Sequence, residues 1–300
     1  MNRILAFDYR AHDSFVAPAR QRPQIWRLLF GLVLIAAIYV ALTQAVFSTI
    51  FQMAGSDADA LFDEVNTGST PRGMYLLLFQ FGLLGAATVF ACFSLHKRGL
   101  ASLFGGAAAR RQGILVLAGM ILLYAVIWAL PPYGGAERLE FGISIGLWLV
   151  LLPLSLLAIF VQASTEEILF RGYLQQQLAA RFRSPLIWIV LPSVLFGFGH
   201  YMPEMAGENA LMISVWAAIF GLVAADLTAR SGTLGPAIAV HFINNVSALL
   251  FMSQPDDMNG LALYITPFSL SDTEAVRPWL WVDFGIMLVS WLTARLVLRR

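Results

Sequence analysis

The sequence predicts an all-α fold, a polytopic membrane bundle of about eight transmembrane helices, and three observations predict it. The first is composition, since 59% of the 300 residues are hydrophobic and only 12% are charged. A soluble domain carries roughly 25% charged residues, so this chain is solvated mainly by lipid. The second observation is a series of apolar stretches of spanning length, and the third is an uneven distribution of lysine and arginine along the chain.

Eight stretches are apolar over about the 20 residues that a helix needs to cross a bilayer. They are 26–51, 73–95, 113–130, 142–163, 185–201, 209–228, 234–252 and 278–298. The fifth stretch is short and contains Pro192, Gly197 and Gly199, so we expect a kinked or half-depth helix there. In the connection 164–184, the sequence "YLQQQLAARF" favours a helix that lies at the membrane interface.

The basic residues give the orientation of these helices. If the N-terminus is inside, sixteen of the nineteen lysines and arginines fall on inner segments, as the positive-inside rule requires. We therefore expect an integral, multi-pass protein with both termini cytoplasmic, in the inner or plasma membrane if the host is bacterial. The expected divisions are a cytoplasmic arm (1–25), three N-terminal membrane helices (26–141), a catalytic core (142–252), and an outer loop with the last helix (253–300).

Net charge and cysteine content exclude several functions. The net charge is +1 and no basic stripe or RNA-binding motif is present, so no nucleic-acid partner is expected. The single cysteine, Cys92, lies in an apolar stretch, so neither an intrachain disulfide nor a cysteine metal cluster can form. Membrane lipid is the partner that composition itself implies.

The segment "STEEILFRG" places Glu166, Glu167 and Arg171 directly after a membrane stretch. A charge near hydrocarbon costs ~3 kcal/mol or more unless it is paired or hydrated, so it indicates a functional site. On a helix Glu167 and Arg171 are four residues apart and can form an ion pair. Glu166 is rotated by about 100° and faces another environment. An interfacial pair that only reaches the inner membrane surface is the alternative interpretation of these three residues.

Two further polar groups follow in later membrane stretches. "FGFGH" ends the fifth stretch with His200, and "HFINN" places His241 and Asn245 one helical turn apart inside the seventh. Each group also has a structural interpretation, as an interfacial histidine or as a hydrogen-bonding contact between helices. Taken together, two carboxylates, two imidazoles and an amide suit peptide-bond hydrolysis, which needs a base for water and donors for an oxyanion. The same groups could ligate zinc with an open position for water, although HExxH is absent.

"EEILFR", "FGFGH" and "HFINN", in this order on successive late stretches, resemble the EExxxR, FxxxH and HxxxN motifs of the CPBP family. This family contains the CAAX-prenyl proteases and the bacteriocin-processing (Abi) proteins, and the resemblance covers roughly 150–252. It implies an intramembrane CAAX-type endopeptidase in which Glu166 and His200 activate water and His241 and Asn245 stabilise the oxyanion. Glu167 and Arg171 would support the site, and the substrate would be a peptide or protein that is membrane-associated or lipidated.

The resemblance does not decide whether a metal ion takes part in the reaction. The family is often described as metallopeptidases, and a metal-free, glutamate-dependent mechanism is also proposed for it. If a divalent metal such as zinc is present, Glu166, His200 and His241 are the expected ligands. The alternative functions are a membrane carrier and a regulatory scaffold that use the same polar cavity without proteolysis. A carrier would show internal repeats or paired broken helices, and the polar residues here cluster in one half of the chain.

Hydropathy and motif order predict different depths in the membrane for Glu166 and His200. Hydropathy places Glu166 near the inner face, whereas His200 lies sixteen residues beyond Ser184, about 24 Å across the membrane at 1.5 Å per residue. The motifs require these residues to meet. We therefore expect the fifth helix to be broken at Pro192 or Gly197, or to begin deeper, with the catalytic centre in a hydrated cavity at mid-membrane.

Overall fold

The computed structural model describes residues 8–130 and 139–299. The first seven residues of the expected arm and residues 131–138 of the expected first membrane unit lie outside the described residues. Within the described ranges, six helices are long and apolar enough to cross a membrane, and two shorter apolar helices, 186–198 and 235–251, accompany them. Every apolar stretch predicted from the sequence is therefore helical, and the prediction of a polytopic helical bundle is confirmed.

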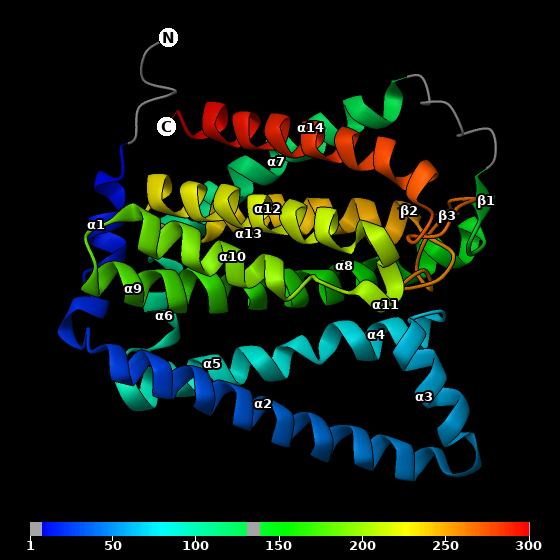
Figure 1. Ribbon diagram of the computed structural model, residues 1–300, viewed down its shortest axis with the longest axis horizontal. Helices are drawn as coiled ribbons and strands as arrows, with labels where there is room; N and C mark the ends of the chain where they lie inside the picture. Colours follow the sequence, from blue (N-terminus) through cyan, green and yellow to red (C-terminus); the bar gives the residue numbers. More distant parts are fainter. Residues whose placement is uncertain (1–7, 131–138, 300) are drawn as a thin grey trace.

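The helices that form the bundle are arranged side by side along one axis (Figure 1). They are α2 (Ile25–Ala54), α4 (Pro71–Phe79) followed by α5 (Phe81–His96), α7 (Ala108–Ala129), α8 (Ile145–Glu167), α10 (Leu191–Phe198), α12 (Ala210–Ser231), α13 (Gly235–Val246) and α14 (Thr273–Leu298). Three of them begin with a side chain that accepts a hydrogen bond from the first turn, which is the usual N-cap. The capping residues are Thr70, Ser144 and Asp272.

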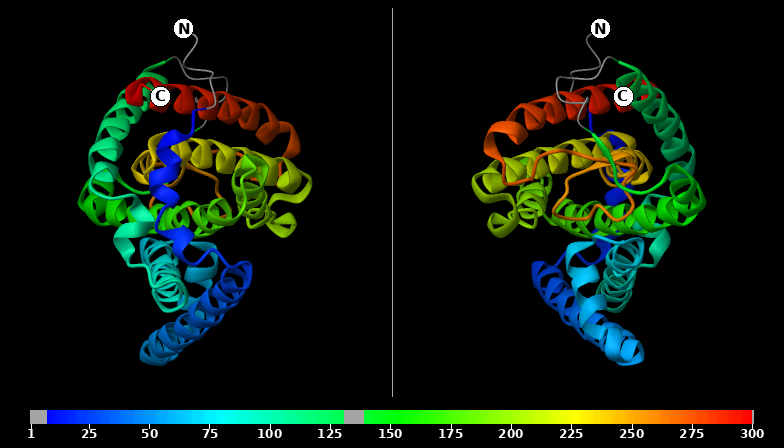
Figure 2. Two further views of the ribbon diagram at one scale, coloured as in Figure 1. Left: turned by 90° about the vertical axis from the view of Figure 1, so that its left-hand side faces the viewer. Right: turned by 90° about the vertical axis from the view of Figure 1, so that its right-hand side faces the viewer.

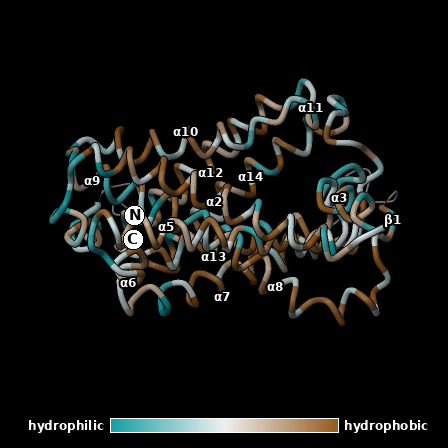
Figure 3. The backbone as a smooth tube through the Cα atoms, turned by 90° about the horizontal axis from the view of Figure 1, so that it is seen from below, coloured by the Kyte–Doolittle hydropathy of each residue, from teal (hydrophilic) through white to brown (hydrophobic). Residues whose placement is uncertain are grey.

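Shorter elements lie at the two ends of the bundle or extend the long helices. They are α1 (Arg10–Val16), η1 (Ala19–Gln21), η2 (Gly55–Asp57), α3 (Ala58–Thr67), α6 (Leu100–Phe104), α9 (Gln176–Arg181), α11 (Pro203–Ala206) and η6 (Gly207–Asn209). Three segments are π-helical, namely η4 (Ile168–Gln175), η5 (Leu186–Val190) and η7 (Ser247–Phe251). Hydrophilic residues gather mainly at these ends, as the tube in Figure 3 shows.

A small sheet closes the end of the bundle opposite α1. It contains β1 (Glu140–Phe141), β2 (Met252–Ser253) and β3 (Tyr264–Ile265), in the order β1-β3-β2. β3 pairs antiparallel with β1, with Phe141 opposite Tyr264, and parallel with β2, with Met252 opposite Tyr264. This sheet joins the ends of α8, α13 and the 253–272 connection on one side of the bundle, and it leaves the all-α fold class unchanged.

α13 is the central helix of the bundle. It packs against α7, α8, α12 and α14, and its residues from Gly235 to His241 are all buried. Gly235 allows α13 to pack closely against α7, because a Cβ atom at this position would overlap the carbonyl oxygen of Ala109 on α7. The two end views in Figure 2 show that α2 and α5 form a separate hairpin on one side of this core. That hairpin contacts the core mainly through α5, which packs against α8 and η4, while α2 contacts α9.

Candidate functional site

The glutamates lie well inside a helix rather than at its end, which corrects the sequence-based prediction. α8 does not stop near residue 163 but continues through η4 and α9 as one helix from Ile145 to Arg181. The segment 164–184 therefore does not begin a separate helix but continues α8 as far as Arg181. Hydropathy failed here because polar side chains that are buried against other helices lower the score of a segment as much as side chains in water do.

This continuation resolves the disagreement about depth. Glu166 lies fifteen residues before Arg181, and His200 lies fourteen residues after Leu186. At 1.5 Å per residue, both are roughly 22 Å from the turn that joins the two antiparallel helices. α10 packs against η4, so Glu166 and His200 reach the same level of the bundle. The fifth helix runs from Leu186 to Phe198 without a break at Pro192 or Gly197, and the chain turns at His200.

Glu167 is the centre of a fully buried ionic cluster. Its side chain is 0% exposed, and its Oε1 accepts a hydrogen bond from Nη1 of Arg171 at 3.0 Å and contacts Nδ1 of His241 at 2.8 Å. The predicted pairing of Glu167 with Arg171 at four residues' separation is therefore present in the structure. Arg171 also donates from Nη2 to the carbonyl oxygen of Gly221 on α12 at 3.2 Å. The cluster thus connects α8, α12 and α13.

Aromatic rings enclose the same cluster. The guanidinium of Arg171 lies 4.9 Å from the ring centre of Phe196, in the geometry of a cation–π contact. The ring of His241 meets Phe220 edge-on at 5.0 Å. Phe196 and Phe220 are both buried, so these rings exclude lipid and hold the imidazole and the guanidinium in place.

Glu166 faces the other nitrogen of the same histidine. Its Oε2 lies 3.3 Å from Nε2 of His241, and its side chain is 12% exposed. In the described part of the chain, no hydrogen-bond donor is found for Oε2 of Glu166 or for Oε2 of Glu167. Unpaired buried acceptors of this kind are costly unless water or a ligand satisfies them. The carboxylate of Glu166 therefore has an acceptor available for water.

His200 reaches the cluster through Phe196. Its ring lies 4.5 Å from the ring of Phe196, which in turn lies 6.1 Å from the ring of His241. The two imidazoles are therefore no farther apart than the sum of these centre-to-centre distances. Nδ1 of His200 lies 2.8 Å from the carbonyl oxygen of Phe196. A carbonyl only accepts, so Nδ1 carries the proton, and in the neutral imidazole Nε2 is a free acceptor.

Asn245 is held by a residue that the sequence analysis missed. Its Nδ2 donates to Oε1 of Gln162 at 2.7 Å, and its Oδ1 accepts from Nδ2 of Asn244 at 3.3 Å. Gln162 lies one turn before Glu166 and thus on the same face of α8. That spacing was the available signal, because a glutamine in an apolar stretch needs a hydrogen-bonding partner as a glutamate does.

The described residues form no three-ligand metal site. No group of three side chains from histidine, cysteine, aspartate and glutamate is arranged to hold a metal ion among the residues that the structure describes. Both nitrogens of His241 face carboxylates, and Nδ1 of His200 faces a backbone carbonyl. The expected ligand set of Glu166, His200 and His241 does not fit a metal in this arrangement, and we derive no chemical step through one.

The segment of the chain that contains this cluster matches a known protein family. Residues 147–247 match the model of the Rce1-like family, described as "Type II CAAX prenyl endopeptidase Rce1-like". The match confirms the family resemblance that the three motifs predict, and it indicates an intramembrane protease of the CAAX type. The family description does not support the expectation of a metalloendopeptidase.

A relative extends the similarity beyond this segment. The "Uncharacterized protein YyaK" of Bacillus subtilis (strain 168) is 26% identical over 265 residues, which cover 83% of this chain and 85% of that protein. No solved structure matches the chain. The helices and the family together show an integral, multi-pass membrane protein.

Proposed function

We propose that the chain is an intramembrane endopeptidase that hydrolyses a peptide bond with a water activated by Glu166 and His200, and that His241 and Asn245 stabilise the oxyanion. The proposal rests on the different hydrogen-bond partners of two histidines in the cluster that contains Glu166, whose Oε2 has no hydrogen-bond donor among the described residues. Nε2 of His200 is free to accept a proton, whereas Nε2 of His241 can be held as a donor. A hydrolytic site needs both properties on the two sides of the scissile carbonyl.

The donor character of His241 follows from its contact with Glu167. The carboxylate of Glu167 is paired with Arg171 and can only accept, so Nδ1 of His241 carries a proton. Nε2 then donates only when the ring is an imidazolium. The buried carboxylate of Glu167, 2.8 Å away, balances that positive charge. In this role Glu167 and Arg171 position and charge-balance His241 and do not contact the substrate.

The proton transfers balance with these groups alone. Glu166, assisted by His200, accepts a proton as water attacks the carbonyl carbon, and the resulting oxyanion accepts hydrogen bonds from His241 and Asn245. Collapse of the tetrahedral intermediate breaks the C–N bond, and the protonated base returns its proton to the leaving amine. Asn245 has a second N–H for the oxyanion, because only one of its two amide hydrogens is donated to Gln162.

We further propose that the termini face the cytoplasm and that the substrate is a peptide or protein held at the membrane. The start of α1 and the end of α14 lie at the same end of the bundle (Figure 1), in agreement with an even number of crossings and with the distribution of basic residues. Labelling of single cysteines in a Cys92→Ala background tests the orientation. Ser56 and Asn259 should react from outside and Gly106 from inside.

The function is tested with the full chain reconstituted in liposomes and internally quenched peptides that end in a CAAX sequence, with and without a prenyl group. We expect the wild-type protein to release the C-terminal fragment, and the folded variant Asn245→Ala to lose roughly 10²–10³-fold in kcat, as for a lost oxyanion donor. Adding a chelator should leave the rate unchanged. Peptide uptake into the liposomes without cleavage would identify a carrier instead, and neither uptake nor cleavage would favour a scaffold.

A further inference from the structure

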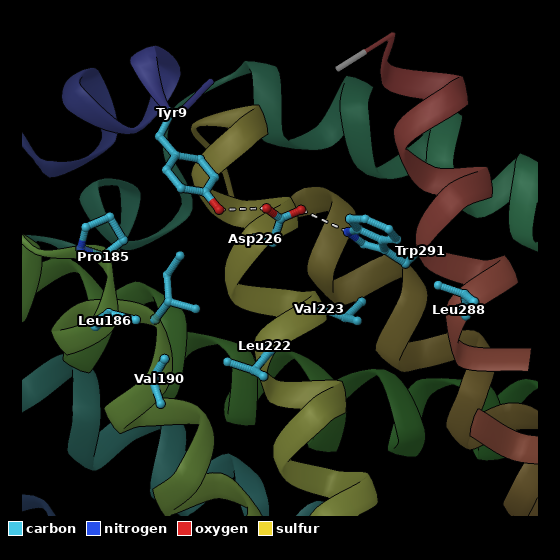
Figure 4. A pocket seen from close by; sticks show the side chains of 10 residues that line it. Tyr9, Pro185, Leu186, Val190, Leu222, Val223, Asp226, Leu288 and Trp291 are labelled. Carbon is cyan, nitrogen blue, oxygen red and sulfur yellow. Dashed lines mark hydrogen bonds between the residues drawn. The ribbon is translucent and has the colours of Figure 1, made fainter. Parts of the chain in front are cut away.

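A lateral groove of about 710 Å³ runs between η5, which leads into α10, and α14, with α12 beneath it. Figure 4 shows its walls, which are apolar along most of their length. They are formed mainly by Leu186, Ile189, Val190, Leu222, Val223 and Leu288. The volume lies within the range of pockets that bind small ligands, roughly 300–1,000 Å³. A groove with such walls at the lipid-facing side of the bundle suits an acyl chain.

This groove is separate from the candidate catalytic site. Leu222, Val223 and Asp226 face the groove from α12, whereas Phe220 and Gly221 of the same helix contact His241 and Arg171. At 100° per residue these two sets lie on opposite faces of α12. A molecule in the groove therefore does not occupy the place of the scissile peptide.

One end of the groove is formed by Asp226, whose carboxylate is already satisfied by protein donors. Asp226 accepts hydrogen bonds from the hydroxyl of Tyr9, from Nε1 of Trp291, and from Nε of Arg230, and Figure 4 shows the first two. Tyr9 and Pro185 line the groove and also line a second cavity of about 560 Å³. The two cavities therefore adjoin at the end of the bundle that carries α1.

The second cavity has an excess of positive charge. Its lining contains Arg10, Arg20, Arg181 and Arg183 but only one acidic residue, Asp13. Arg10 and Arg20 form ion pairs with Asp8 and Asp13. Arg181 and Arg183 are exposed, and no ion pair joins either of them to another described side chain. An anionic group at this position would meet two guanidinium groups that form no ion pair with the side chains that the structure describes.

From this arrangement we propose that the two adjoining cavities bind one anionic phospholipid of the leaflet next to α1. One acyl chain lies in the groove between η5 and α14, and the phosphate lies against Arg181 and Arg183. Guanidinium groups suit phosphate oxygens because they can donate two parallel hydrogen bonds. Basic residues next to a membrane helix attract anionic lipids by about 1 kcal/mol each. The apolar groove adds selectivity for a molecule that has both a chain and a charged head group.

The test is thermal unfolding of the detergent-solubilised full chain while lipid is titrated into the micelles. Dioleoyl phosphatidylglycerol and dioleoyl phosphatidylcholine provide matched chains with an anionic and a neutral overall charge. For the wild type we expect saturable stabilisation at a lower concentration of phosphatidylglycerol than of phosphatidylcholine. The double variant Arg181→Gln/Arg183→Gln should need roughly 30-fold more phosphatidylglycerol and should respond to phosphatidylcholine as the wild type does.

Two controls separate this site from general surface effects. Arg110→Gln/Arg111→Gln removes the same charge from exposed positions on α7 and should keep the wild-type response. Val190→Trp, at the end of η5, fills the groove and should abolish stabilisation by both lipids. Val194→Trp, four residues later on α10 at a 53% exposed position outside the groove, should not.

Three results would overturn the proposal. The first is an unchanged preference for phosphatidylglycerol in the Arg181→Gln/Arg183→Gln variant, in which both replaced side chains are exposed. The second is an equal loss in the Arg110→Gln/Arg111→Gln control. The third is stabilisation of the wild type by glycerol phosphate alone, which would show a site for free phosphate and not for a lipid.

Discussion

Two buried clusters in this bundle share the same local design and differ in how their carboxylates are satisfied. In each, an acid and an arginine four residues apart on one membrane helix form an ion pair, Glu167 with Arg171 on α8 and Asp226 with Arg230 on α12. Asp226 has donors on both oxygens, from a tyrosine, a tryptophan and its arginine. In the first cluster, one oxygen of each neighbouring glutamate has no donor among the described residues.

The difference separates a structural cluster from a reactive one. A carboxylate whose acceptors are all occupied by protein donors has nothing left for water, and it serves to connect α1, α12 and α14. A buried carboxylate with an open acceptor is costly for stability, and it is expected where chemistry requires it. Sequence spacing is identical in the two pairs, so only their surroundings assign the roles.

The largest expected effect is the difference between replacing a carboxylate by its amide in the reactive cluster and making the same replacement in the structural cluster. Glu166→Gln keeps shape but removes the base, so kcat should fall by roughly 10²–10⁴-fold with little change in melting temperature. Asp226→Asn should leave kcat of the folded protein nearly unchanged. Peptide cleavage and thermal unfolding of both variants measure this contrast. Wild-type cleavage by Glu166→Gln would show that another group is the base.

The second effect concerns the ion pair of the reactive cluster. Glu167→Gln leaves Arg171 buried without a counter-charge, which should lower the free energy of unfolding by ~3–5 kcal/mol. Adding Arg171→Met should recover part of this loss but not cleavage, because His241 then lacks the carboxylate that balances its charge. Thermal unfolding and cleavage rates for the single and double variants check this. A fully stable Glu167→Gln would mean that the pair is hydrated.

The third effect concerns the structural cluster. Asp226→Asn replaces an acceptor of three donors by an amide that can satisfy fewer of them, so the protein should lose about 1–3 kcal/mol of stability. The arm should also detach more easily, because Tyr9 loses a charged acceptor. Limited proteolysis between α1 and α2, compared with Tyr9→Phe as a matched variant, measures the detachment. Equal protection in all three proteins would contradict a connecting role for Asp226.

A smaller effect is expected at Gln162, which positions Asn245. Gln162→Leu removes the acceptor for Nδ2 of Asn245, a hydrogen bond worth about 1 kcal/mol, so kcat should fall by roughly fivefold to tenfold with KM nearly unchanged. Gln162→Glu retains an accepting oxygen and should recover part of kcat. A change confined to KM or to melting temperature would assign Gln162 to substrate binding or to packing.

The smallest effect concerns an acid outside the membrane helices that has no arginine partner. Burial raises the pKa of Asp257, in the loop after β2, to about 6 from its usual 3.8, despite a backbone hydrogen bond from Met258 that lowers it. The folded state therefore favours the protonated acid. That contribution to stability is fully present below about pH 4 and is lost as the pH rises through 6. Melting temperatures of wild type and Asp257→Asn across pH 4–7 should converge at low pH and diverge at high pH.

The sequence by itself determined the fold class, the approximate positions of the membrane helices and the pairing of Glu167 with Arg171. These properties depend on composition over about 20 residues or on contacts one helical turn apart, so the local sequence contains the information. The order of the three motifs also predicted that Glu166, His200 and His241 lie near one another, and in the structure Glu166 contacts His241 while Phe196 lies between the two imidazole rings.

Only the tertiary structure decided the depth of that site and the partners of its side chains. Hydropathy ended the fourth span near residue 163 because it cannot distinguish a polar residue in water from one that neighbouring helices bury. Gln162 with Asn245, and Asp226 with Tyr9 and Trp291, are contacts between residues at least 65 positions apart. Such contacts arise from the packing of whole helices, and no local pattern in the sequence encodes which side chain will meet which.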